Sequence, residues 1–273
     1  MRTTKDGSNL FPALIKHWRN RRGLSQLDLA LTAGVSARHL SFLETGRAHP
    51  SRAMILRLAT ALSVPLRDQN ALLVAAGLTE AYAEPGAEAA LAGPVHEAVE
   101  HMLAHHEPYP MVVMNRLYDI LRTNAGAAAL LPRVVAEPAA LAGRPNALRM
   151  LFDPRQGRPF VLEWERVARA LLQRLHREVL ERANDDALAD LLREALAYPG
   201  VPLDWQQPDL GAPSEPCLAI RLRTPDLELA FLTTITVFSA PQNLTLDELR
   251  IESYWALDDV TRRACERFVR PRH

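Results

Sequence analysis

The sequence predicts two domains of different class, an all-α N-terminal domain of five helices and an α+β C-terminal domain. The 273-residue chain is longer than one typical domain. From residue 10 to residue 76, apolar residues recur at helical spacing between Gly and Ser residues. After residue 217 the apolar period changes to two, which favours strands. We place the domains at residues 1–79 and 95–273, joined by a connector at 80–94.

The charge distribution supports this division. The formal net charge is zero, but residues 1–79 contain 11 Lys and Arg against 4 Asp and Glu, and residues 80–273 contain 21 against 28. A basic module joined to an acidic one indicates that the first meets a polyanion. We expect a cytoplasmic protein, because there is no signal-like or membrane-spanning apolar run and the two cysteines form neither a metal motif nor a disulfide framework.

Each N-terminal helix has start and stop signals. Ser25 and Ser36 are candidate N-caps of the second and third helices, and Gly23 and Gly46 suit helix ends. Gly34 allows the positive φ of a sharp turn between those two helices. The predicted helices are residues 10–22, the segment between Ser25 and Gly34, residues 37–44, the segment from Ser51 to Leu62, and residues 66–76. Five short helices with this tight turn form a helix-turn-helix domain.

The third helix is the one expected to enter the major groove of DNA. If Leu40 and Leu43 face inward, the remaining side chains at its start face outward. Arg38 can form two hydrogen bonds to guanine, and Ala37 or Phe42 can touch a thymine methyl group. Gln26 at the start of the second helix is placed to hold a phosphate, and His49 suits the neighbouring backbone. The candidate DNA-binding residues are Gln26, Ser36, Ala37, Arg38, His39, Ser41, Phe42, Arg47 and Arg52.

The stretch LSQLDLALTAGVSARHLSFLETGRAHPS, residues 24–51, resembles the Xre family of phage-repressor-like helix-turn-helix proteins. The resemblance covers residues 10–76, with Leu31-Thr32 standing where charged residues are commoner. It implies that double-stranded operator DNA is the partner. It also implies that the Glu ending the recognition helix, Glu44, pairs with Arg19 of the first helix in an architectural role.

The C-terminal domain is predicted element by element from the same signals. A helix at 95–106 precedes two strands, MVVMN and YDILRTN, separated by a turn at Asn115-Arg116. Short helices follow Asn124 and begin at 147, and longer helices span 159–182 and 185–197. Three strands come next, CLAIRLRTP, LELAFLTTITVF and LRIESYWAL, with turns at Asp226 and Pro241-Gln242-Asn243, before a last helix at 258–268. A five-stranded antiparallel sheet with helices on one face satisfies this order, which is a PAS-like layout.

Such a sheet and its helices form a cup that commonly holds a small molecule. The segment HEPYP…NRLYDILRTNA also looks like the MmyB-like ligand-binding domain that follows an Xre module in many bacterial regulators. This resemblance spans 95–257 and is best at 105–131. It implies a ligand-responsive transcription regulator, with a fatty acid or similar acyl compound as the ligand and no required cofactor.

An acyl pocket needs apolar walls and a polar anchor. The candidate walls are Val113, Ile120, Phe152, Trp164, Leu171, Phe231, Ile235 and Trp255. The candidate anchors are Tyr118, Arg122, His176, Thr233 with its neighbours Thr234 and Thr236, and Tyr254. Each wall residue is equally explained as packed core, and each anchor as a satisfied or solvated polar group.

Catalysis finds no support in the sequence. There is no nucleophile elbow, phosphate-binding loop, dinucleotide fingerprint or zinc-protease motif. His101 and His105 share a helix face that could bind a metal, but they lack further ligands at matching spacing. We therefore expect neither an enzyme nor a metal site.

These observations predict a homodimeric DNA-binding regulator whose C-terminal domain senses a small apolar ligand. A two-fold dimer reads half-sites about 10 base pairs apart or a multiple of that. The alternative keeps the DNA-binding module but gives the C-terminal domain only a dimerising or protein-binding role.

Overall fold

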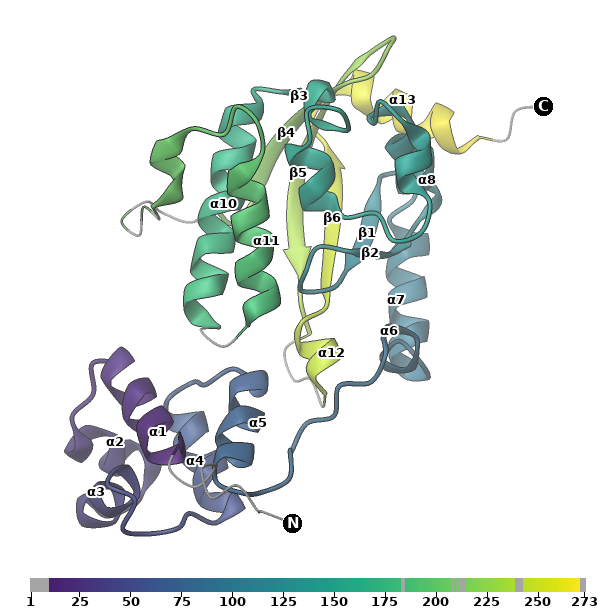
Figure 1. The fold of residues 1–273 in the computed structure, drawn as a ribbon. Coiled ribbons are helices and arrows are strands. Elements are labelled where there is room, and N and C mark those ends of the chain that lie inside the picture. The colour runs from purple at the N-terminus through teal and green to yellow at the C-terminus, as the bar shows by residue number, and fades with distance from the viewer. Residues whose placement is uncertain are drawn as a thin grey trace, which may run out of the picture. The chain divides into compact units, whose positions relative to one another are not determined.

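The computed structural model of the chain describes residues 10–182, 185–207, 209, 211, 215–238 and 243–270. These residues form two compact units, drawn in Figure 1, with the main boundary between Glu84 and Pro85. That boundary lies inside the predicted connector. No described helix is both long and apolar enough to cross a membrane.

The N-terminal unit contains the five predicted helices. They are α1 (Leu10–Arg21), α2 (Gln26–Ala33), α3 (Ala37–Glu44), α4 (Arg52–Ala61) and α5 (Leu66–Ala75). Each contributes fully buried apolar side chains to one core, among them Ile15, Leu29, Leu40, Ile55 and Leu72. The helical period of the sequence therefore identified the elements and most of their inward residues, although Leu27, predicted on the apolar face of α2, is 59% exposed.

Residues after α5 also belong to this unit. Asn70 of α5 donates from Nδ2 to the carbonyl oxygen of Tyr82 at 2.7 Å and accepts from the backbone N–H groups of Ala81 and Tyr82. Arg67 pairs with Glu84. The predicted end of the domain at residue 79 is thus five residues short, because polar side chains of α5 satisfy the backbone of a segment that has no period of its own.

The C-terminal unit is built on one antiparallel sheet with the strand order β2-β1-β6-β5-β4-β3. The strands are β1 (Met111–Met114), β2 (Ile120–Thr123), β3 (Val161–Leu162), β4 (Leu218–Arg223), β5 (Glu228–Thr236) and β6 (Arg250–Ala256). The sequence predicted five of these six. The sixth, β3, lies within the helix predicted at 159–182, because Pro159 opens a short 3-10 turn and Glu163 has a φ of 53° that separates the strand from the helix.

Helices cover both faces of the sheet. They are α6 (Ala87–Ala90), α7 (Pro94–His105), α8 (Ala125–Leu130), α9 (Ala147–Phe152), α10 (Trp164–Glu181), α11 (Asp186–Ala197), α12 (Leu244–Asp247) and α13 (Asp259–Val269). Short 3-10 turns are η1 (Leu131–Arg133), η2 (Pro138–Leu141), η3 (Arg158–Phe160) and η4 (Leu203–Gln206).

The expectation of helices on one face was wrong. Val99 and Leu103 of α7 pack against Val113 of β1 on one face, whereas α10 and α11 pack against the other face, as Figure 1 shows. Strand β1 is buried along its whole length. A strand that is apolar on both sides needs cover on both sides, and its sequence, MVVM, carries that signal.

Two turns were predicted at residues the structure describes. The turn at Asp226 is confirmed, since Thr224 N donates to the carbonyl oxygen of Leu227 at 2.8 Å. The turn at Asn115-Arg116 is longer than expected and reaches Asp119, because Asn115 Oδ1 accepts from two backbone N–H groups and Tyr118 has a φ of 64°. In the third predicted turn, Pro241 and Gln242 lie outside the described residues.

Candidate functional site

The helix-turn-helix is assembled by local capping. Ser25 accepts from the backbone N–H of Asp28, and Asp28 accepts from Ser25, which is a capping box at the start of α2. Gly34 ends α2 with a φ of 63°, and Ser36 caps α3 by accepting from His39 N at 3.1 Å. These caps use backbone groups that each helix end would otherwise leave unpaired. They therefore set the angle at which α3 leaves the turn.

The structure brings Arg19 and Glu44 together beneath α3. Arg19 Nε lies 2.6 Å from Glu44 Oε1, and Arg19 Nη2 lies 3.0 Å from Oε2. Arg19 Nη1 donates to the carbonyl oxygen of Leu24, and Gln26 Nε2 donates to Glu44 Oε2. Burial raises the pKa of Glu44, but the hydrogen bonds from Arg19 and Gln26 outweigh it and hold that pKa below its usual value. The ion pair thus ties α1, α2 and the end of α3 into one body.

The exposed side of α3 carries the predicted reading residues. Leu40 and Leu43 are fully buried, whereas Arg38 is exposed. The Arg38 guanidinium lies 5.4 Å from the centre of the Phe42 ring, a cation–π contact that steadies the long side chain. Ser36 is exposed, and Ala37, His39 and Ser41 are partly exposed. One face of α3 therefore offers a cation, a hydroxyl group and an aromatic edge together.

Two predicted phosphate-binding residues have partners within the protein. Arg52 Nη2 donates to the carbonyl oxygen of Thr79 at 2.6 Å and to that of Glu80 at 3.0 Å. The side-chain amide of Gln26 donates a hydrogen bond to Glu44 Oε2. Arg52 thus holds the segment that follows α5, which spacing along the sequence did not reveal. Arg47, by contrast, is exposed immediately after α3.

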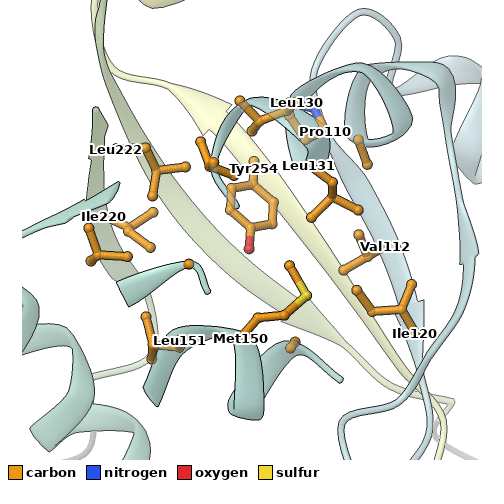
Figure 2. A pocket seen from close by; sticks show the side chains of 15 residues that line it. Pro110, Val112, Ile120, Leu130, Leu131, Met150, Leu151, Ile220, Leu222 and Tyr254 are labelled. Atoms are coloured by element: carbon orange, nitrogen blue, oxygen red, sulfur yellow. The ribbon is translucent and has the colours of Figure 1, made fainter. Parts of the chain in front are cut away.

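The C-terminal unit contains an apolar cavity between the sheet and the short helices α8 and α9. The volume of this cavity is about 100 Å³, well above the roughly 10–15 Å³ that one water molecule needs. Figure 2 shows the side chain of Tyr254 among the lining residues, with the Val112 and Ile120 side chains on one side and those of Ile220 and Leu222 on the other. Leu130, Leu131 and Met150 close it from the helices.

Tyr254 supplies the polar side chain of this lining. The lining residues are Pro110, Val112, Ile120, Ala127, Leu130, Leu131, Val134, Ala147, Met150, Leu151, Gly157, Val161, Ile220, Leu222 and Tyr254. Burial raises the pKa of the Tyr254 hydroxyl well above its usual value, and the neighbouring Glu252 carboxylate adds to the shift. The hydroxyl therefore stays protonated at physiological pH and is a hydrogen-bond donor.

Of the thirteen predicted ligand-binding residues, Ile120 and Tyr254 line the cavity. Four of the others, Phe152, Trp164, Leu171 and Phe231, pack in the core between the sheet and α10–α11. Val113 points to the opposite face of the sheet, toward α7. The amphipathic period of a helix identifies its buried side but cannot tell a packed interior from a hollow one, so it did not indicate which of these residues line the cavity.

Four more predicted residues, three anchors and the wall residue Trp255, also have partners away from the cavity. Tyr118 lies against Glu178 and Arg250, and His176 Nε2 lies 3.0 Å from the carbonyl oxygen of Trp205. Thr233 bonds to the Glu252 carboxyl group. Trp255 is 47% exposed and donates to Thr234 Oγ1.

Two further predicted residues do not line the cavity. Ile235 is partly buried opposite Glu252 of β6, and Arg122 lines a separate shallow groove next to β2.

The lining residues that sequence reasoning missed come from short elements. Ala127, Leu130 and Leu131 belong to the run AGAAALLP, and Ala147, Met150 and Leu151 to ALRMLF. Small side chains in a helix of six residues are a weak hint of space beside it. Over the described part of the chain, no group of three His, Cys, Asp or Glu residues could hold a metal ion.

Two family models match the chain. Residues 95–268 match the MmyB-like transcription regulator ligand binding domain, which spans more than half of the chain, and residues 15–69 match a helix-turn-helix model. A search of curated proteins found no match. The two matches correspond to the two units that carry α3 and the cavity.

Proposed function

We propose that α3 reads operator DNA and that the cavity binds the ligand that controls this DNA binding. The proposal starts from the family to which the chain belongs, that of the MmyB-like transcription regulator ligand-binding domain. The observation that carries the proposal is the pairing of an exposed, capped recognition helix with a separate apolar cavity in one chain. The ligand is a small apolar compound such as an acyl compound, and the active species is a homodimer.

The DNA-binding proposal is supported by the architecture under α3. The buried Arg19–Glu44 pair holds α3 from below, so its exposed residues are presented by a rigid support. Rigid placement matters because bidentate contacts to a base require the guanidinium and the base edge to lie in one plane. Arg38 is the exposed residue of α3 that can make such a contact.

The test begins with selection of bound sequences from a random duplex library by the purified full chain. Arg38→Ala should then weaken binding to the selected operator by about 1–3 kcal/mol and relax preference at one base pair. Arg262→Ala, which removes the same charge from the exposed surface of α13, is the matched control and should bind normally. An unchanged binding curve for Arg38→Ala would reject the assignment of α3.

The ligand-binding proposal is supported by the lining of the cavity, in which fourteen of the fifteen residues are apolar or glycine. Burying an alkyl chain there releases about 0.8 kcal/mol per methylene group. Mass spectrometry of organic extracts from the purified protein should reveal an acyl compound. Ala147→Phe, which places a ring in the cavity, should reduce its amount. Equal recovery from both proteins would place the compound elsewhere.

Control of DNA binding requires that the ligand prefer one arrangement of the dimer. A ligand shifts such an equilibrium only by its difference in affinity for the two states. Binding of the selected operator should therefore change when ligand is added, and the affinity for the ligand should change by the same factor when operator is added. A coupling factor of one in both titrations would refute a sensing role.

A second candidate function for the C-terminal unit is assembly alone, and exposed apolar side chains favour it. Trp255 and Leu257, at the end of β6, are 47% and 55% exposed. Such side chains on a sheet surface are typical of contacts between proteins. Trp255→Lys should then lower the dimer fraction in sedimentation experiments while leaving ligand recovery unchanged.

A further inference from the structure

The hydroxyl group of Tyr254 is the polar side-chain group that faces the cavity. Figure 2 shows its oxygen directed into the space between the lining side chains. Among the described residues, nothing accepts a hydrogen bond from it. A ligand that fills the cavity shields this hydroxyl from solvent, so a ligand with a hydrogen-bond acceptor avoids the cost of leaving it unpaired.

The position of that hydroxyl is set by contacts on both sides of β6. The backbone N–H of Tyr254 donates to the carbonyl oxygen of Pro110 at 3.0 Å, and His106 Nε2 lies 3.0 Å from the Tyr254 carbonyl oxygen. The ring meets Phe231 edge-on, with centroids 5.7 Å apart. A donor held in this way loses little freedom when it meets an acceptor.

The electrostatic surroundings disfavour an anion in the cavity. The lining contains no Lys, Arg or His side chain. Glu252 and Arg250 precede Tyr254 on the same face of β6, at alternate positions. The Arg250 guanidinium pairs through Nη2 with Glu178 Oε2 at 3.0 Å, its Nη1 is buried without a hydrogen-bond partner, and Arg250 is not among the lining residues. An ionised carboxylate in the cavity would thus lie near an acid with no cation among the lining residues, which is costly.

We propose that the cavity selects an uncharged, mainly apolar carbonyl compound, such as an ester, lactone or ketone, whose oxygen accepts a hydrogen bond from Tyr254 Oη. This inference rests on the proposed ligand-binding function and narrows it. The alkyl part lies against the aliphatic side chains around the ring. The charge-free lining excludes the ionised form of a fatty acid and accepts the corresponding ester.

The experiment compares three soluble probes on the full chain after lipids have been removed on a hydrophobic resin. Methyl hexanoate is the neutral carbonyl probe, hexanoate is its ionised counterpart, and benzene fills apolar space without a hydrogen bond. Isothermal titration at pH 7.5 should show a Kd for methyl hexanoate at least about tenfold lower than for hexanoate. Tighter or equal binding of hexanoate would overturn the inference.

The role of the hydroxyl is tested by Tyr254→Phe, which keeps the ring and its contact with Phe231. This variant should raise the Kd of methyl hexanoate by roughly two- to tenfold and leave that of benzene unchanged. Tyr198→Phe is the matched control, because its hydroxyl lies 3.4 Å from Glu194 Oε1 and its side chain is outside the lining. Unchanged ester affinity in Tyr254→Phe would also overturn the inference.

The probes separate failure of this inference from failure of the proposed function. If benzene binds and the ester shows no preference over hexanoate, the cavity is a ligand site but Tyr254 does not select the ligand. If none of the probes binds, the ligand-binding role of the cavity fails as well, and this inference fails with it.

Discussion

Loss of one partner of the Arg19–Glu44 pair should destabilise the N-terminal unit severely. The side chains are 11% and 2% exposed, and two short hydrogen bonds join them. In Glu44→Ala the buried guanidinium keeps only its bond to the carbonyl oxygen of Leu24. Leaving a buried charge in this state costs about 3–5 kcal/mol, a large share of the roughly 5–15 kcal/mol that stabilises a typical domain.

Hydrogen exchange followed by mass spectrometry measures this effect in the full chain. Peptides from α1 and α3 report the free energy of opening of the N-terminal unit, and peptides from β5 and β6 report the C-terminal unit as an internal control. Glu44→Ala should accelerate exchange throughout α1 and α3. It should leave β5 and β6 unchanged.

The double variant Arg19→Met/Glu44→Met decides whether the effect comes from the pair. Replacing both charges with apolar side chains of similar length is often neutral, whereas each single change strands a charge. The double variant should therefore be more stable than Glu44→Ala and than Arg19→Met. If the losses of stability in Arg19→Met and Glu44→Met simply add in the double variant, the two charges do not stabilise each other, and the reasoning is refuted.

Three further predictions concern DNA binding, packing and pH. The logarithm of the association constant for the operator should fall linearly with the logarithm of the salt concentration, because phosphate contacts release counterions. An affinity independent of salt would contradict a role for the basic N-terminal unit in DNA binding. Gly126→Ala should lower thermal stability, since a Cβ there would lie 2.5 Å from the Pro108 carbonyl oxygen, whereas Gly86→Ala has open space and should not. The pKa of Glu44 is lowered in the folded state, so its stabilisation is present above the unfolded value of about 4.3 and is lost as pH falls through the folded pKa. The loss of stability on acidification, measured by hydrogen exchange in α1, should be smaller in Glu44→Gln than in the unmodified chain. An identical pH profile in the two proteins would contradict the role of Glu44 in this pH dependence.

Several features of the fold were predictable because they depend on local order along the chain. The capping serines Ser25 and Ser36, and Gly34 with its positive φ, act on neighbouring backbone groups only. Helix boundaries in the N-terminal unit were therefore correct to within one or two residues. The change of period after residue 217 likewise identified β4, β5 and β6.

The cavity was predicted poorly, because hollow and packed interiors have the same apolar pattern. Phe231 and Tyr254 lie on the same face of the sheet, but one fills the core and the other faces free space. Trp255 alternates with Tyr254 and is exposed on the other face. Which apolar residue meets empty space depends on how closely α8 and α9 approach the sheet.

The sequence alone determined the two units, the recognition helix and the helical or extended state of most segments, since caps, turns and hydrophobic periods act over a few residues. Only the tertiary structure decided that Arg52 holds Thr79 and that a cavity opens around Tyr254. It also placed helices on both faces of the sheet. These features arise from distances between segments far apart in the chain, which pattern and spacing along the sequence do not encode.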